Sequence, residues 1–185
     1  TGCQSVAAAK PKTAKPTKPT KELTAGQTVT VTLETNCGTI PIELDTKRAP
    51  KTASSFASLA EQGFYDGLSF HRIVPGFVIQ GGDPQGTGIG GPGYKVVEAP
   101  PKDLAYTKGV VAMAKTEVEK PGTSGSQFFI VTGEDVGLPP DYALVGKVTG
   151  DGLETAAKIE AIPSDQNTGM PSEPVVISKA TVSGE

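Results

Sequence analysis

The sequence offers few residues for the common kinds of catalytic site. It contains one histidine, His71, no tryptophan, and only two cysteines, Cys3 and Cys37, which lie far apart in the chain. A structural zinc site takes four Cys or His ligands, so no metal site is expected. A serine nucleophile would need His71 as its base, but Ser124 and Ser126 lie outside the strained turn pattern of such hydrolases. Hydrolysis is therefore not predicted.

A glycine-rich stretch at residues 86–91, Gly-Thr-Gly-Ile-Gly-Gly, has the spacing of a dinucleotide-binding loop. In such a loop a helix begins directly after the glycines and receives the phosphates at its N-terminus. Here Pro92 and Gly93 follow instead, and they favour a surface loop. The sequence thus predicts no nucleotide and no other cofactor.

A more informative segment places polar side chains in an otherwise apolar pair of predicted strands. Residues 70–83 read Phe-His-Arg-Ile-Val-Pro-Gly-Phe-Val-Ile-Gln-Gly-Gly-Asp, which closely resembles the signature of the cyclophilins. A second segment resembles another core motif of that family, with Met113-Ala114 followed by Gly-Ser-Gln-Phe-Phe-Ile at 125–130. Leu138 and residues 146–148 follow in the expected order, so the resemblance covers about residues 28–182.

What this resemblance implies is a mainly β fold: a closed eight-stranded antiparallel β-barrel capped by two helices, with a groove on its outer face. The implied activity is peptidyl-prolyl cis-trans isomerisation of X-Pro bonds in folding protein substrates. By position in the motifs, Arg72 is the expected catalytic residue. Five residues are expected to form the proline pocket, namely Phe77, Val78, Phe129, Leu138 and Tyr142. Three others are expected to hold the flanking peptide backbone, namely Gln80, Ala114 and Gln127.

The sequence departs from the best-known cyclophilins at three positions in or next to these residues. Gly137 stands where many eukaryotic members have Trp, and Tyr142 where they have His, which implies weak cyclosporin binding. Lys115 stands where an Asn often supplies a backbone contact, so a substrate carbonyl could be held differently. Activity is still expected, because Arg72 and the apolar pocket are retained.

An arginine beside an apolar pocket suits this reaction. Rotation about an X-Pro bond is slow because amide resonance must be lost, with a barrier of about 20 kcal/mol. In the twisted state the proline nitrogen regains a lone pair, which a directed donor stabilises more than the planar ground state. The guanidinium of Arg72 is always charged and offers several N–H donors. To reach a rate of about 10³ per second, the enzyme must lower the rotation barrier by roughly 7 kcal/mol, which is more than one hydrogen bond supplies. Phe77 and Phe129 must therefore also contribute, by holding the proline ring and excluding water.

The hydrophobic pattern predicts the elements that would position these residues. Apolar residues alternate with polar ones over residues 29–33 and again over 40–44, which predicts an antiparallel hairpin. The period then becomes helical over residues 50–62, where Pro50 suits a first turn and Gly63 an end. Further strands are predicted at residues 69–73, 77–80, 94–97, 110–113, 127–131, 143–148 and 175–181, and a second helix at 153–159. The last strand is expected to pair with the first.

Composition divides the chain in two. Residues 1–26 hold five Lys, one Glu and several Pro, and almost nothing that could be buried, so a flexible tail or membrane tether is predicted there. Residues 27–185 are expected to form the isomerase domain. This part carries 12 basic and 19 acidic residues, which argues against nucleic acid as a partner. A monomer that acts on proline-containing polypeptides is expected, because a closed barrel leaves no strand edge to pair.

Cys3 follows two small residues at the start of this polar stretch, which resembles the end of a bacterial lipoprotein signal. Acylation of Cys3 is therefore predicted, and with it export and anchoring to the outer face of a bacterial membrane. A Cys3–Cys37 disulfide is the alternative, although a free tail would disfavour it. Two functional alternatives also stay open: a noncatalytic module that binds proline peptides, and a surface lipoprotein whose barrel is a scaffold or adhesin.

Overall fold

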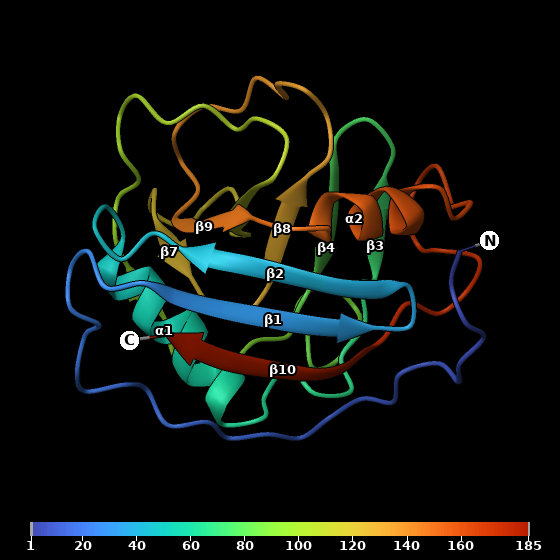
Figure 1. The fold of residues 1–185 in the computed structure, drawn as a ribbon, viewed down its shortest axis with the longest axis horizontal. Helices are drawn as coiled ribbons and strands as arrows, with labels where there is room; N and C mark the ends of the chain where they lie inside the picture. The colour runs from blue at the N-terminus through green and yellow to red at the C-terminus, as the bar shows by residue number, and fades with distance from the viewer. Residues whose placement is uncertain (1, 185) are drawn as a thin grey trace.

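A curled antiparallel sheet dominates the structure, a computed structural model that describes residues 2–184 (Figure 1). Eight strands form this sheet in the order β10-β1-β2-β9-β6-β8-β4-β3, and β5 and β7 form a small second sheet. The strands are β1 (Val29–Thr35), β2 (Gly38–Leu44), β3 (Arg72–Val74), β4 (Val78–Gly81), β5 (Val96–Val97), β6 (Val110–Met113), β7 (Thr123–Ser124), β8 (Phe128–Val131), β9 (Leu144–Val148) and β10 (Ile177–Gly184). The helices are α1 (Pro50–Glu61) and α2 (Gly152–Glu160).

The predicted pairing of the last strand with the first is confirmed, since β10 lies antiparallel to β1 along its length. The other edge of the sheet, β3, does not form a full ladder with β10. The chain just before β3 closes this gap, because Phe70 N–H donates to Val175 O at 2.9 Å and Ile177 N–H donates to Leu68 O at 2.8 Å. The sheet is therefore a nearly closed barrel.

The two phenylalanines of β8 show how the core and the outer face are separated. Phe128 is fully buried, and its ring meets the rings of Phe56, Tyr65 and Phe70 edge-on at 5.5 to 5.7 Å. Phe129 points the other way, because successive side chains of a strand alternate between faces. It belongs to a second, smaller cluster on the outside of the barrel. Phe128 therefore belongs to the core and Phe129 to the outer face.

Two helices cover opposite ends of the curled sheet (Figure 1). Helix α1 begins with Pro50 at its first position, as predicted, and buries Phe56 and Leu59 against the core. Helix α2 packs beside β2 and is one residue longer at each end than predicted. The two-residue strand β7 was not predicted, since Thr123 and Ser124 show no alternation from which a strand could be inferred.

The N-terminal segment, residues 2–26, differs from the prediction of a free tail. It contains no helix or strand, as its prolines imply, but it runs along the domain below β10 and α1 (Figure 1). Thr17 N–H donates to Gln62 Oε1 at 2.9 Å and Leu23 N–H donates to Ser54 Oγ at 2.7 Å, both in or next to α1. Backbone groups of the segment thus find partners on the domain, which composition alone does not reveal.

The sulfur of Cys3 forms a disulfide with Cys37, across 34 residues of sequence. Beside it, Gln4 N–H donates to Asn36 O at 2.7 Å and Asn36 Nδ2 donates back to Gln4 O at 2.8 Å. In this form the Cys3 sulfur has no free valence for a lipid, so acylation would need the reduced thiol and stays a prediction. No helix among residues 2–184 is long and apolar enough to span a bilayer.

Candidate functional site

Arg72 and Gln80 face each other across the β3–β4 hairpin. They are directly paired residues in the ladder, so both side chains project from the same face of the sheet. Arg72 Nη1 donates to Gln80 Oε1 at 3.2 Å. Gly169 leaves room for the arginine, because a Cβ added there would lie 2.7 Å from Arg72 Cγ, and its φ of +77° favours glycine. The hairpin and this loop together hold the guanidinium over the outer face.

A row of side-chain amides continues from Gln80. Gln80 Nε2 donates to Gln127 Oε1 at 3.1 Å, and Gln127 Nε2 donates to the carbonyl of Gly90 at 3.0 Å. Every bond in the row points its donor away from Arg72, an order in which hydrogen bonds reinforce one another. The row ties the arginine to the glycine-rich loop at residues 86–91.

A cavity of about 200 Å³ opens beside the guanidinium. Its lining residues come from three strands and three connecting segments and are Arg72, Phe77, Val78, Gln80, Ala114, Lys115, Phe129, Leu138 and Tyr142. A second cavity of about 190 Å³ adjoins it, shares Gln80, Ala114 and Lys115, and adds Gln127. All nine residues that the sequence assigned to the groove therefore line these two adjoining cavities.

Tyr106 supports the aromatic wall from behind, and the sequence did not single it out. The rings of Phe129 and Tyr142 meet edge-on at 5.4 Å, and the Tyr106 ring lies 6.0 Å from that of Tyr142. The Tyr106 hydroxyl donates to Tyr142 O at 2.7 Å and accepts from Tyr142 N–H at 3.1 Å. Burial raises the pKa of Tyr106 to about 12, so this hydroxyl keeps its proton at neutral pH. Only a pattern spanning 36 residues could have revealed the pair.

Lys115 lines the cavity, at the position where the family often has an asparagine. Its ammonium group sits 5.5 Å from the centre of the Tyr142 ring, a cation–π distance, and donates to Thr116 O at 3.2 Å. A flexible cation therefore replaces a fixed amide beside the pocket.

His71 is buried and lines a different cavity from Arg72. Its Nδ1 makes no hydrogen bond to the residues that the structure describes. Burial lowers the pKa of His71, although the nearby Asp83 carboxylate opposes this. His71 thus lacks the position for a base in the groove.

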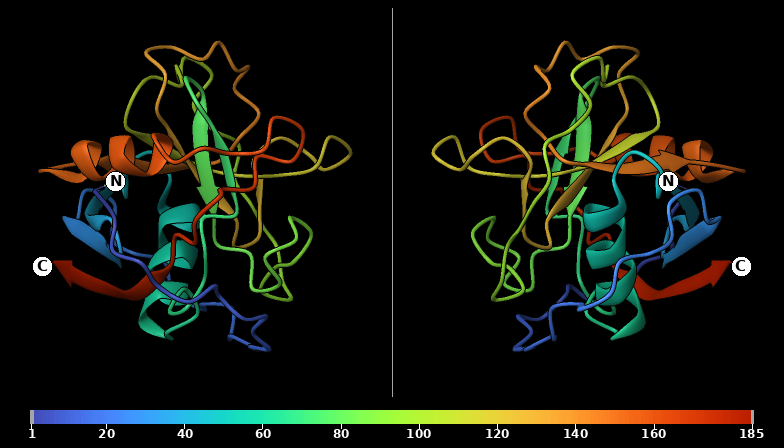
Figure 2. Two further views of the ribbon diagram at one scale, coloured as in Figure 1. Left: turned by 90° about the vertical axis from the view of Figure 1, so that its right-hand side faces the viewer. Right: turned by 90° about the vertical axis from the view of Figure 1, so that its left-hand side faces the viewer.

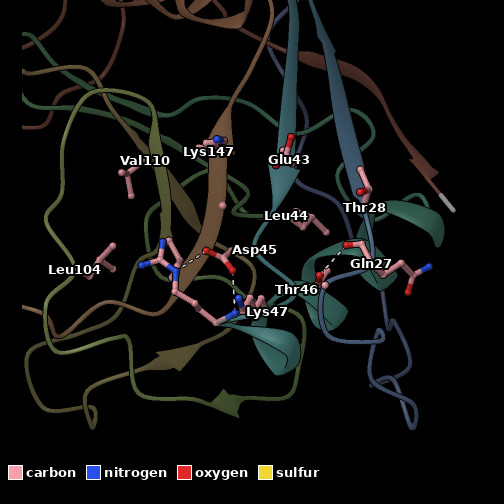
Figure 3. A pocket seen from close by; sticks show the side chains of 14 residues that line it. Gln27, Thr28, Glu43, Leu44, Asp45, Thr46, Lys47, Leu104, Val110 and Lys147 are labelled. Atoms are coloured by element: carbon pink, nitrogen blue, oxygen red, sulfur yellow. Dashed lines mark hydrogen bonds and ion pairs between the residues drawn. The ribbon is translucent and has the colours of Figure 1, made fainter.

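A larger cavity, of about 350 Å³, lies elsewhere on the barrel (Figure 3). Within it, Arg48 Nε donates to Asp45 Oδ2 at 2.8 Å and Thr46 Oγ1 donates to Gln27 O at 2.7 Å. It offers no arginine beside an aromatic slot. Within residues 2–184 no group of three or more His, Cys, Asp or Glu could hold a metal ion.

The groove around Arg72 has a cationic donor, apolar walls and a row of amides, but no nucleophile paired with a base. It can hold a small apolar ring and place a donor beside it without breaking a bond. The sequence model of the cyclophilin type peptidyl-prolyl cis-trans isomerase family matches residues 30–182. The chain belongs to the cyclophilins. It is a peptidyl-prolyl cis-trans isomerase of the cyclophilin type.

Relatives of this cyclophilin occur in bacteria and animals. The probable peptidyl-prolyl cis-trans isomerase A of Mycobacterium leprae is 41% identical over 174 residues, covering 85% of this chain and 93% of the relative. The peptidyl-prolyl cis-trans isomerase-like 3 of Gallus gallus is 42% identical over 156 residues, covering 82% and 94%. A crystal structure of a Cryptosporidium parvum cyclophilin, obtained in the presence of the dipeptide Ala-Pro, aligns with a TM-score of 0.77 and 34% identity, covering 84% and 99%.

Proposed function

We propose that the groove around Arg72 is where this cyclophilin turns X-Pro bonds, and that Arg72 is its catalytic residue. The observation that carries this assignment is the position of the guanidinium at the edge of a cavity walled by Phe77, Phe129 and Tyr142. The charged donor is thereby held next to the place where an apolar ring fits. The Ala-Pro dipeptide present with the Cryptosporidium relative supports a proline-containing peptide as the ligand.

Arg72 acts through the proline nitrogen. As the X-Pro bond twists, this nitrogen loses conjugation and gains a lone pair, which accepts a hydrogen bond that the planar amide cannot accept. Arg72 Nη1 is oriented by Gln80 Oε1, and the remaining N–H groups are free to reach the substrate. The donor is fixed before the reaction begins, so no reorganisation is needed in the twisted state.

The remaining groove residues form two sets, which bind different parts of the substrate. Phe77, Phe129 and Leu138 hold the proline ring and exclude water, which would otherwise favour the planar and more polar amide. Gln80, Ala114 and Gln127 line the adjoining cavity and bind the backbone before the proline. Rotation is then confined to one bond.

The test compares the two arginines of the chain in a protease-coupled assay on a short X-Pro peptide. Arg72→Ala removes the donor, and a loss of about 10² to 10³ in kcat/KM is expected, as for other donors directed at a transition state. Arg48→Ala is the matched control, because Arg48 pairs with Asp45 and lines a different cavity from the groove. Equal rates for Arg72→Ala and the wild type would exclude the assignment.

We also propose that the protein works outside the cytoplasm. The Cys3–Cys37 disulfide supports this, because disulfides persist in oxidising compartments and are rare in the cytosol. Anchoring through a lipid on Cys3 is a second exported form, in which the same sulfur carries the lipid and Cys37 keeps its thiol. Intact mass of the native protein distinguishes the two forms: a disulfide removes two hydrogen atoms, and acylation adds the lipid.

A monomer is the proposed assembly state. The backbone bonds between residues 67–70 and 175–177 cover the ends of the sheet, so little unpaired strand edge is left to recruit a second chain. Sedimentation at micromolar concentration should give the mass of one chain. A mass of twice that value would point to an interface on another face.

A further inference from the structure

Within the N-terminal segment, Lys12 makes the most hydrogen bonds to the domain. All three hydrogen atoms of its ammonium group are used, because Lys12 Nζ donates to the carbonyls of Gly63 at 2.7 Å, Phe64 at 3.1 Å and Asp66 at 2.8 Å. These carbonyls belong to the turn that directly follows α1 (Figure 2). A cation is favourable there, where the carbonyl groups of the helix end point. Lys12 thus fastens this turn.

The turn bound by Lys12 is connected to the groove through the side chain of Tyr65. Tyr65 is fully buried, and its hydroxyl donates to Ser126 O at 3.0 Å. Ser126 Oγ in turn donates to Gly82 O at 2.7 Å. Gln127, the next residue, therefore has its backbone held from the side of the turn.

The backbone of Lys12 holds a second element. Its N–H donates to Pro84 O at 2.8 Å, directly after Asp83. The Asp83 carboxylate is buried and accepts from the N–H groups of Gln85 at 2.8 Å and Thr87 at 2.9 Å, and also from Gly88. These bonds shape the glycine-rich loop at residues 86–91.

The glycine-rich loop also contacts Gln127. Gly90 O accepts the hydrogen bond of Gln127 Nε2 at 3.0 Å, and Gln127 Oε1 accepts from Gln80, the partner of Arg72. Two paths, one through Tyr65 and one through Asp83, therefore lead from Lys12 to Gln127. The first fixes the backbone of Gln127 and the second its side chain.

We propose that Lys12 is a positioning residue for the isomerase groove, and that the Cys3–Cys37 disulfide keeps it in place. The inference rests on the groove assigned above. Lys12 touches no substrate; it acts by restricting where Gln127, and through it Gln80 and Arg72, can lie. The glycine-rich loop needs such a restraint, because glycines leave its backbone many conformations.

The disulfide restrains the segment before Lys12, which has few side chains that could hold it by packing. Residues 4–11 contain few side chains that can be buried, so ordering them costs conformational entropy with little compensation. A covalent link at Cys3 shortens the free chain before Lys12 to eight residues and raises the local concentration of the ammonium group at its carbonyls. Without the link, nothing covalent holds the chain before Lys12 near the end of α1.

The first test replaces Lys12 in the oxidised full-length chain. Lys12→Met should lower kcat/KM for an X-Pro tetrapeptide about threefold to tenfold, the range of coupling through a network of contacts. Lys12→Arg should restore most of this rate, since a guanidinium also donates to several carbonyls. Lys15→Met is the matched control, because the Lys15 side chain is exposed and makes no hydrogen bond within residues 2–184. Equal rates for Lys12→Met and Lys15→Met overturn the proposal.

A second measurement separates positioning from general stability. In Lys12→Met, the NMR signals of the Gln127 side-chain amide and of the backbone amides at residues 86–91 should shift or broaden at temperatures far below unfolding. If these signals stay unchanged while only the melting temperature falls, Lys12 has a purely structural role and the proposal fails.

The role of the disulfide is tested by a double-mutant cycle. The variant Cys3→Ser/Cys37→Ser should lose activity as Lys12→Met does, and adding Lys12→Met to it should cost little more, because both changes release the same contact. Independent, multiplicative losses would overturn the link between the disulfide and Lys12. Failure of the proposed groove is a separate outcome, since in that case Arg72→Ala would already be as active as the wild type.

Discussion

At the scale of single residues, the orientation of the Arg72 guanidinium depends on the side-chain amide of Gln80. This amide is not expected to contact the X-Pro bond that rotates. Gln80 accepts from the guanidinium and donates to Gln127, so it both orients the proposed catalytic donor and joins it to the rest of the groove. An arginine without such a partner would sample several rotamers above the cavity. In the proposed mechanism, the orientation of the donor therefore contributes to the rate as well as its charge.

Replacement of Gln80 by methionine should expose this dependence. Gln80→Met keeps the length of the side chain but removes both hydrogen bonds, and kcat/KM should fall about tenfold, or about 1.4 kcal/mol of transition-state stabilisation. The same replacement at Gln4, whose exposed side chain lies in the N-terminal segment, is the control for the chemical change itself. The protease-coupled assay measures both, and an unchanged Gln80→Met would show that Arg72 orients itself.

His71 should make the stability of the protein depend on pH. Burial lowers its pKa in the folded state, so the unfolded chain takes up the proton first as the pH falls. The folded state is then fully stable above a pH of about 6.5, and loses stability as the pH drops from there toward the lowered pKa. One proton limits the slope to about 1.4 kcal/mol per pH unit. The free energy of unfolding in urea at several pH values measures it.

The control for this prediction is clear, because His71 is the one histidine of the chain. In His71→Phe the slope between pH 7 and pH 5.5 should largely vanish, whatever the replacement does to stability at neutral pH. Asp83 does not interfere in this window. Burial alone would raise the pKa of its carboxyl, but four backbone N–H bonds outweigh it and lower the pKa, so Asp83 titrates only in stronger acid. An unchanged slope would mean that another group takes up the proton.

At the scale of elements, the helices and the long strands could be predicted from the sequence. Pro50 and Gly63 mark the two ends of α1, and alternation marks β1 and β2, because each of these signals is local. The groove residues were predicted through the family motifs. The two-residue strand β7 and the contact of Tyr106 with Tyr142 could not be, since both depend on partners supplied by distant segments.

The start of α1 illustrates such a distant partner. Ala49, which precedes the helix, has no side chain that could cap it. Glu98 takes this role from another part of the chain: its carboxylate accepts from Lys51 N–H at 3.0 Å, Thr52 N–H at 2.9 Å and Thr52 Oγ1 at 2.7 Å. A negative charge at this end is also favoured by the helix dipole. Glu98 therefore links the β5 region to α1.

Removal of this cap should destabilise the fold without affecting catalysis. Glu98→Ala should reduce the free energy of unfolding by about 1 to 2 kcal/mol, the typical cost of a lost helix cap. Glu98→Gln keeps an acceptor and should lose less. Denaturant unfolding measures the change, and kcat/KM below the melting temperature should stay at the wild-type value. A full loss in Glu98→Gln would assign the effect to charge alone.

At the scale of the whole molecule, the largest difference from the predictions is the N-terminal segment. Its Lys and Pro content is typical of a spacer, and by composition it has nothing to bury. The structure attaches it through the Cys3–Cys37 disulfide, through backbone groups and through the ammonium groups of Lys12 and Lys18, and these partners lie far away in the sequence, as in the turn after α1. No local pattern encodes contacts of this kind. Composition therefore predicts the conformation of the segment but not its position.

Hydrogen exchange can decide whether this segment lies on the domain in solution. Four of its amides donate to the domain, those of Gln4, Lys12, Thr17 and Leu23. In the oxidised chain these amides should exchange about tenfold or more slowly than an unstructured peptide, because each must first open from its acceptor. In Cys3→Ser/Cys37→Ser the protection of Gln4 and Lys12 should be lost first, since they lie nearest the broken link. Uniformly fast exchange in the oxidised chain would mean that the segment is the free spacer that its composition predicts, and would remove Lys12 from the groove.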